Sequence, residues 1–298
     1  MTEVHNRRIK AIAGNGTGSV KLFPTPGKRL HGVGLNLSWA SGVSTAGDTL
    51  LEQVAAITEI RVLVGTAVRR RITGPQIRDY MLLNGATYDF DAVSTYVAQM
   101  YIPFAEDWFI AGVADSLAWN PAIIGGPISV ELDIAVLNTS YFPTVTAYER
   151  VSDDLNAPSS GIITWETLSV VAGGTAFYVD QTILKPRGRL IQATIYPSSG
   201  AATTAISAVS LLCGPNEVAA HEALTVAEND DLLGRSGLTP RNTSRISYAY
   251  SYDLVAVRGD ALAHAIDLEA WKTYKLKIES GSAMSGTCQI QVARLEAR

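Results

Sequence analysis

The chain has 298 residues, of which 47% are hydrophobic and 17% are charged, and it carries a formal net charge of −4. This length can bury one large core or two ordinary ones, and a charged fraction below the roughly 25% of an average soluble domain indicates that other protein covers part of the surface. The acidic balance argues against a nucleic-acid-binding protein, so no specific nucleic-acid partner is expected.

Basic residues gather at two places near the start of the chain. Arg7, Arg8 and Lys10 form the first cluster, and residues 69–71 are three consecutive arginines. The simplest interpretation of both is a solvated strand or terminus, and the alternative is contact with anionic lipid or nucleic acid inside a particle. The N-terminus has no apolar signal-peptide core, and the sequence has no run of 18 apolar residues. The protein is therefore expected to be soluble when made and not exported by a signal peptide.

The first half of the chain is predicted to form short strands with two short helices. Residues 59–64 and 68–72 predict two strands joined by a tight turn. Thr73 and Gln76 fit a capping box that begins a helix. Residues 49–57 have apolar side chains at helical spacing and predict a second helix. Further strands are predicted over residues 19–23, 32–38, 99–104 and 128–136.

A break in the strand pattern divides the chain into two units of similar size. Apolar and polar residues alternate strictly over 128–136, and strand patterning resumes only at Ile162. We place a linker at 146–160. It joins an N-terminal unit at 1–145, which includes a short N-terminal arm, to a C-terminal unit at 161–298.

The second half has the same character. Strands are predicted over residues 162–170, 176–183, 189–196 and 205–212. Two alternating runs, 274–278 and 288–292, flank the glycine-containing segment 281–286 and predict a closing hairpin. Elements this short and this numerous, joined by Gly, Pro and Asn turns, are typical of an all-β sandwich or jelly roll.

Motifs that carry chemistry are scarce. Neither a complete zinc-protease motif nor a complete phosphate-binding loop is present, and the four histidines are scattered. We therefore predict no catalytic residue and no cofactor. Acidic pairs could supply oxygen ligands for a structural calcium ion, although a solvated acidic loop is the simpler interpretation. These weak metal candidates are Asp153, Asp154, Asp230 and Asp231.

Two further sets of side chains are informative about packing. Cys213 and Cys288 lie in strand contexts, which favours buried free thiols, although a disulfide stays possible if the two residues face each other. Four aromatic residues in loop-like contexts are candidates for subunit contacts, where aromatic side chains concentrate. They are Trp108, Phe109, Tyr141 and Phe142.

Taken in order, several segments resemble the major capsid proteins of bacteriophages with an internal lipid membrane, of the corticovirus type. In the first half these are KRLHGVGLNLS, the EIRVLV-GTA-VRRRI hairpin, the helix TGPQIRDYMLLNG, YIPFAEDW and the long strand ISVELDIAV. In the second half they are LKPRGRLIQATIYPSS, NDDLLGRSGLTP and the final run from Tyr274. The resemblance spans most of the chain and preserves the order of the elements, but the turn at Gly65 lacks the expected Asn-Gly.

The resemblance implies a fold and a structural function. It implies two consecutive eight-stranded jelly rolls, a double β-barrel with a few short helices. Three chains would form a pseudo-hexagonal homotrimer, and trimers would tile an icosahedral shell over a lipid membrane. The partners would be other copies of the chain and other virion proteins, such as vertex and membrane proteins. The protein would be made in the cytoplasm of a host bacterium and located in the virion, with Arg7, Arg8 and Lys10 facing the membrane.

Two other classes of function remain open from the residues. A tandem β-sandwich also suits a carbohydrate-binding or receptor-binding module, such as a phage spike, which would expose an aromatic platform. An enzyme with a sandwich fold, either a glycosidase or a cupin-like oxygenase, would need paired carboxylates or clustered histidines. The scattered histidines disfavour the oxygenase, and carboxylate pairing depends on the fold.

Overall fold

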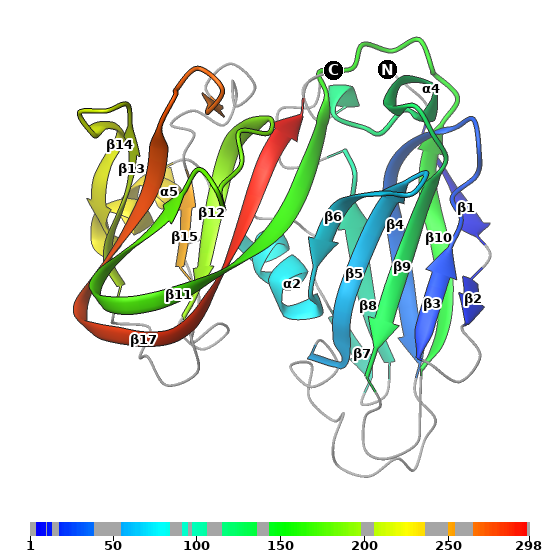
Figure 1. Cartoon of the computed structure of the whole chain (residues 1–298). Helices are drawn as coiled ribbons and strands as arrows, with labels where there is room; N and C mark the ends of the chain where they lie inside the picture. The colour runs from blue at the N-terminus through cyan, green and yellow to red at the C-terminus, as the bar shows by residue number, and fades with distance from the viewer. Residues whose placement is uncertain are drawn as a thin grey trace. The chain divides into compact units, whose positions relative to one another are not determined.

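The computed structural model describes residues 4–9, 11–13, 18–38, 55–83, 91–94, 97–105, 115–135, 143–197, 206–235, 250–253 and 265–296. The chain divides into two compact units, Met1–Ile162 and Ile163–Ala297. Strands dominate each unit, and the helices are short (Figure 1). Within the described ranges, no helix has both the length and the hydropathy needed to cross a bilayer.

The first unit is a sandwich of two antiparallel sheets (Figure 1). One sheet has the order β1-β10-β4-β8-β7, formed by His5–Ile9, Thr144–Ser152, Arg29–Ser38, Val97–Pro103 and Asp91–Ser94. The facing sheet has the order β6-β5-β9-β3-β2, formed by Ala67–Ile72, Ile57–Val64, Ile128–Ile134, Ser19–Leu22 and Ala11–Ala13.

Alternation along the strands builds the core of this sandwich. Side chains at every second position point to the same face of a strand, so one face of each sheet is apolar. The buried side chains include Val33, Leu35, Val62, Val130 and Leu132. The alternating pattern that predicts a strand over 128–136 is confirmed as β9.

A hairpin and a capped helix follow each other as predicted. Strands β5 and β6 pair with Val64 opposite Ala67, and Gly65 between them has a positive φ of 60°. Glycine adopts this conformation without steric cost, which explains the turn without Asn-Gly. Helix α2, Gly74–Leu83, begins with the predicted capping box. The Thr73 amide donates to the Gln76 side chain at 3.0 Å, and the Gln76 amide donates to Thr73 Oγ1 at 3.3 Å.

The structure corrects the predicted start of the linker and describes only the end of the helix predicted over 49–57. The linker expected at 146–160 begins too early, because residues 144–152 form β10 and pair with both β4 and β1. Its apolar positions alternate, but charged and hydroxyl side chains between them hide the pattern. In the helix predicted over 49–57, residues 49–54 lie outside the described part of the chain, and Ile57 already belongs to β5.

Arg70, in the second basic cluster, is buried rather than solvated. Its side chain has no exposed surface, and its guanidinium lies 5.0 Å from the ring centre of Trp119 and 5.1 Å from that of Phe104. It also donates a hydrogen bond to the Pro103 carbonyl oxygen. A cation over two aromatic faces is stabilised by their ring quadrupoles, which offsets part of its lost hydration.

Long bent strands organise the second unit. β17, Tyr274–Glu296, pairs through residues 274–280 with β13, Ile206–Cys213, and through residues 289–295 with β12, Arg189–Tyr196. One strand therefore serves both layers. Neighbouring β11, Ile162–Asp180, curves beside it (Figure 1). The remaining strands are β14, Val218–Thr225, β15, Tyr250–Asp253, and β16, Ile266–Asp267.

The closing hairpin predicted around residues 281–286 is therefore wrong. The two alternating runs belong to one strand that bends at its glycine-containing centre, where Gly286 has a φ of 91°. The predicted strands 162–170 and 176–183 likewise merge into β11, with a bend at Gly174. Glycine permits either a reversal or a bend, and distant pairing partners decide between them.

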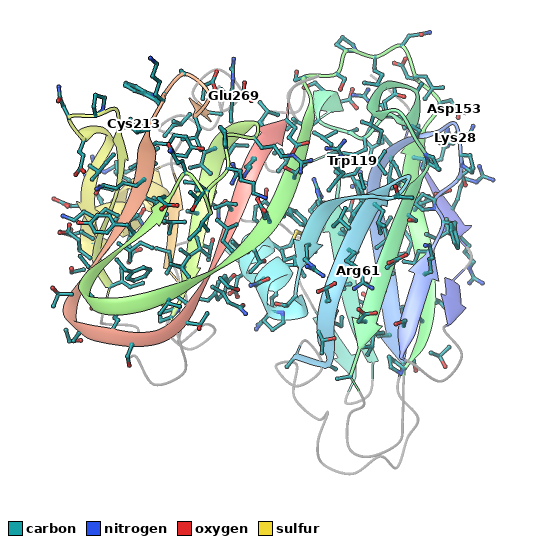
Figure 2. The ribbon with its side chains drawn as sticks, in the orientation of Figure 1. Lys28, Arg61, Trp119, Asp153, Cys213 and Glu269 are labelled. Atoms are coloured by element: carbon teal, nitrogen blue, oxygen red, sulfur yellow. The ribbon has the colours of Figure 1, made fainter. Side chains whose placement is uncertain are left out.

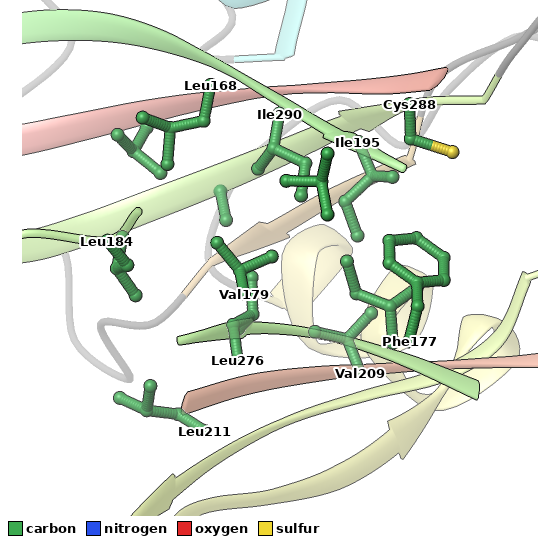
Figure 3. Packing of buried hydrophobic residues seen from close by; sticks show 14 of the residues in the cluster. Leu168, Phe177, Val179, Leu184, Ile195, Val209, Leu211, Leu276, Cys288 and Ile290 are labelled. Carbon is green, nitrogen blue, oxygen red and sulfur yellow. The ribbon is translucent and has the colours of Figure 1, made fainter. Parts of the chain in front are cut away.

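Between these layers lies a second core (Figure 3). It contains Phe177 and Val179 from β11 and Leu276 and Ile290 from β17, with β12 and β13 contributing the facing side chains. Cys213 and Cys288 are both buried and both free, which confirms the prediction of buried thiols.

Helix α5, Val226–Arg235, lies where the acidic pair Asp230 and Asp231 suggested a solvated loop. The Thr225 amide donates to Glu228 at 2.9 Å, and the Glu228 amide donates to Thr225 Oγ1 at 3.3 Å. This is a capping box, which is legible as Thr-x-x-Glu before the helix. A shorter helix, α4, spans Pro121–Ile124 and is capped by Asn120.

Candidate functional site

The basic residues of the N-terminal arm lie on an edge strand. Arg7 and Arg8 are exposed on β1, which pairs with β10 and places Arg7 opposite Glu149 and Arg8 opposite Tyr148. Lys10 lies outside the described residues. An edge strand with charged side chains resists unwanted pairing with other strands. The exposed arginines also remain available to an anionic surface.

The acidic metal candidates occupy two separate places. Asp153 accepts a hydrogen bond from Lys28, which holds the pKa of this carboxyl below its ordinary value, and the charges of His5 and Arg7 act in the same direction (Figure 2). Asp154 follows it. Asp230 and Asp231 lie on α5, where Asp231 pairs with Arg235 at 2.7 Å. Among the described residues, no group of three or more potential metal ligands occurs, and calcium binding stays a prediction.

The four aromatic candidates for subunit contacts fall outside the part of the chain that the structure describes. They are Trp108, Phe109, Tyr141 and Phe142. Their role as contact residues stays a prediction.

A charged network covers the face of the β6-β5-β9-β3 sheet that points away from the core. Arg61 is at its centre (Figure 2) and contacts three carboxylates: Glu59, Glu131 at 3.2 Å and Asp133 at 2.8 Å. Lys21 and Arg71 extend the network on either side, at 2.5 Å from Glu131 and 3.1 Å from Glu59. Three positive and three negative side chains are thereby brought together, so the network is electrically balanced.

The network shifts the pKa values of Glu131, Asp133 and Arg61. A hydrogen bond from Lys21, assisted by one from Arg61, holds the pKa of Glu131 below its ordinary value. Burial alone would raise the pKa of Asp133, but hydrogen bonds from Ser19 and Arg61 lower it. Burial would likewise lower the pKa of Arg61, and its carboxylate partners outweigh that effect and raise it. Glu131 and Asp133 therefore stay ionised at neutral pH.

The outer face of the β1-β10-β4-β8-β7 sheet carries tyrosine rings instead of an ion-pair network. Two glycines of β4, Gly32 and Gly34, leave room for the rings of Tyr101 and Tyr148, which a Cβ at either glycine would overlap. Arg150 donates to the Tyr101 hydroxyl at 3.2 Å. Tyrosine rings thus cover backbone that lacks side chains, and of the two rings Tyr101 is buried whereas Tyr148 is exposed.

The second unit contains an open hollow of about 350 Å³. It is lined by the end of β11, the β13–β14 turn and the start of β17. Figure 2 shows Cys213 and Glu269, which are close in sequence to its lining, at one end of this unit. The lining residues are Asp180, Gln181, Thr182, Leu212, Gly214, Pro215, Glu217, Thr273, Tyr274 and Lys275. No local motif predicts this hollow, because its three segments are far apart in the sequence.

Solved structures reveal what this architecture resembles. No protein-family model and no curated protein matches the chain. The major capsid protein of bacteriophage PM2 superimposes with a TM-score of 0.70 at 13% identity, and the match covers 99% of each chain. The major capsid protein of Sulfolobus Turreted Icosahedral Virus gives 0.65 at 9% identity, covering 98% of this chain and 97% of that one. The PBCV-1 virus capsid gives 0.64 at 9%, with coverage of 99% and 94%.

These likenesses establish the fold. The chain has the double jelly-roll architecture of those capsid proteins, and the predicted fold class is confirmed. The first unit has ten strands within the described ranges, two more than expected, because the N-terminal arm adds β1 and β2. The second has seven, since β17 supplies pairing to both layers in one continuous strand.

Proposed function

We propose that this protein is the major coat subunit of an icosahedral virus, with a structural and non-enzymatic function. The observation that carries the proposal is the match over nearly the whole of both chains to the PM2 capsid protein. A match to a single β-sandwich would be compatible with many functions, because that fold is widely shared. Tandem jelly rolls in one chain, matched together, restrict the choice far more.

The composition supports assembly with other copies. Three chains with two jelly rolls each would give six similar units around a threefold axis, a pseudo-hexagonal outline suited to tiling a shell. Only 17% of the residues are charged, as suits a subunit with large lateral contacts. The balanced network around Arg61 would meet a neighbouring copy without net repulsion.

The finer parts of the proposal concern partners. We propose that Arg7, Arg8 and Lys10 face an internal membrane, where anionic head groups attract basic side chains. We also propose that Trp108, Phe109, Tyr141 and Phe142 contribute to contacts between subunits, and that vertex and membrane proteins bind the assembled shell. A calcium ion at Asp153 and Asp154, or at Asp230 and Asp231, would be structural.

Light scattering after size-exclusion chromatography, with negative-stain microscopy, tests the central proposal. We expect a species of three times the 31.8 kDa chain mass, with a hexagonal outline, and sheets or shells at higher concentration. Repeating the measurement with added calcium and with chelator tests the ion. A monomer at every concentration would overturn the coat-subunit proposal and favour a binding module.

Flotation with liposomes tests the membrane contact. We expect the protein to bind vesicles containing phosphatidylglycerol and not vesicles of phosphatidylcholine alone, and an Arg7→Ala/Arg8→Ala variant to lose most of this binding. An Arg235→Ala/Lys272→Ala variant loses the same charge elsewhere on the surface and serves as the control. Equal binding by both double variants would contradict a membrane role for β1.

A further inference from the structure

We propose that Arg8 and Arg150, on either side of Tyr148, bind the phosphate of an anionic lipid head group on the outer face of the β1-β10-β4-β8-β7 sheet. The inference rests on the proposed membrane contact and assigns that contact to particular side chains. Arg150 stands apart from both basic clusters of the sequence, so the sequence alone gives it no such role.

The strand register places the three side chains together. Arg8 on β1 is directly opposite Tyr148 on the neighbouring β10, and Arg150 is two residues further along β10 (Figure 1). Residues two apart point to the same face of a strand, and Glu149 between them is fully buried, so this face is the outer one. Arg8 and Arg150 are diagonal neighbours, a separation of about 7–8 Å that long side chains can bridge.

Glycines keep the adjoining part of the face clear of side chains. Gly34 and Gly32 on β4 are opposite Tyr148 and Arg150. A Cβ at Gly34 would be 2.0 Å from Cζ of Tyr148, so the ring lies against the backbone, and 39% of this residue stays exposed. Arg150 donates to the Tyr101 hydroxyl at 3.2 Å, which orients the guanidinium through one of its five N–H groups.

The charge of Arg8 has no internal counterion among the residues that the structure describes. Its side chain is exposed and forms no ion pair with them, whereas Arg7, on the other face of β1, is close enough to Asp153 to lower the pKa of that carboxyl. Within the described strands, the rows of the sheet that contain Arg8 and Arg150 include no acidic residue. This edge of the sheet is therefore a positive patch on a chain of net charge −4, and it attracts anions.

The chemistry of the patch fits a phosphodiester at a membrane surface. A guanidinium presents its N–H groups as a planar fork that binds two phosphate oxygens. Tyrosine is enriched at membrane interfaces, where its ring is in apolar surroundings and its hydroxyl is in water. A nucleic acid would need a basic groove that follows several phosphates, whereas these two arginines lie on adjoining strands at one edge. The ligand is therefore the head group of an anionic phospholipid.

Arginine-to-lysine variants test the proposal, because lysine keeps the charge and loses the planar fork. Binding of the full chain to vesicles of phosphatidylglycerol and phosphatidylcholine is measured by flotation at fixed ionic strength. Arg8→Lys/Arg150→Lys should weaken this binding about tenfold. Arg187→Lys/Arg235→Lys alters two exposed arginines of the second unit and should bind as the unaltered chain does. Circular dichroism should show both variants folded.

Equal binding by the Arg8→Lys/Arg150→Lys variant and the unaltered chain would overturn the proposal, because charge alone would then explain the contact. Tighter binding of a single-stranded oligonucleotide than of vesicles, at equal phosphate concentration, would assign the patch to nucleic acid instead. Displacement of the vesicles by inorganic phosphate, but not by chloride at the same ionic strength, would assign it to free phosphate. Failure of the unaltered chain to bind anionic vesicles would overturn the membrane contact together with this inference. The coat proposal is tested separately, by the oligomer mass without lipid.

Discussion

Arg61 lies directly opposite Glu131 in the β5–β9 pair, yet its Nη1 atom approaches Asp133, the diagonal neighbour, to 2.8 Å. One guanidinium thus joins two rows of the sheet. Such a bridge stabilises the sheet more than an isolated surface pair, because each carboxylate is also held by a second donor, Lys21 or Ser19.

Replacing Arg61 should make stability less dependent on pH. The pKa values of Glu131 and Asp133 are lowered on folding from ordinary values of 4.5 and 3.8, so their contribution is complete above those values and is lost as the pH falls through the folded ones. Arg61→Gln should lower the free energy of unfolding by about 1 kcal/mol at pH 7 and by less under acid conditions. Urea unfolding across pH 2.5–7 is the measurement.

Arg71→Gln is the control for that experiment, because the Arg71 side chain is more exposed than that of Arg61 and pairs with Glu59 at the edge of the network. Its effect should be smaller at every pH. An equal loss in both variants, or a loss for Arg61→Gln that is the same at pH 3 and pH 7, would show that the network does not act through its carboxylates.

Gly34 and Tyr148 should be coupled. Alanine at Gly34 would force the Tyr148 ring from its place, so Gly34→Ala should cost about 1–3 kcal/mol. Tyr148→Ala alone should cost less, because this side chain is 39% exposed. If the ring is the obstacle, the double variant should be more stable than Gly34→Ala. Thermal unfolding of all four forms measures the coupling, and simple additivity would contradict it.

The capping box of α5 should be detectable as a lowered pKa of Glu228. Hydrogen bonds from the amide and hydroxyl of Thr225 lower the pKa of Glu228. Thr225→Ala removes the hydroxyl, and the pKa of Glu228 should move back up toward its ordinary value. NMR of chains with ¹³C-labelled glutamate follows it, with Thr182→Ala as a control remote from Glu228. A pKa unchanged by Thr225→Ala would mean that the hydroxyl bond does not form in solution.

Neither cysteine should react while the chain is folded. Burial raises the pKa of the Cys213 thiol, and Cys288 has no exposed surface. A thiol reagent should therefore modify the native protein at the rate of unfolding, and should modify both residues at once in denaturant. Rapid labelling of one thiol in buffer would contradict the packing of the second core.

Local patterns in the sequence predicted the features that depend on local physics. The β9 alternation and the Thr73–Gln76 box both appear as expected, because side-chain period and capping act over a few residues. The bends of β11 and β17 were not predicted, because pairing with distant strands decides whether a glycine-containing segment reverses direction or only bends. The Thr225–Glu228 box was equally legible and was missed, as acidic residues suggested a loop.

No local sequence pattern predicts the hollow of the second unit. Asp180, Glu217 and Lys275 come together only because the end of β11, the β13–β14 turn and the start of β17 meet in the second unit. Composition predicted buried surface but not where it lies. The charged network could have been anticipated in part, since Glu59 and Arg61 on β5 and Glu131 and Asp133 on β9 share the period of two.

The double pairing of β17 has a consequence for biosynthesis. Since β12 and β13 both take β17 as a partner, neither layer of the second unit can be completed until residues 274–295 have left the ribosome. Contacts between segments so distant along the chain form slowly. During that interval the apolar faces of β11, β12 and β13 stay uncovered, and exposed apolar strands of this kind are prone to aggregate.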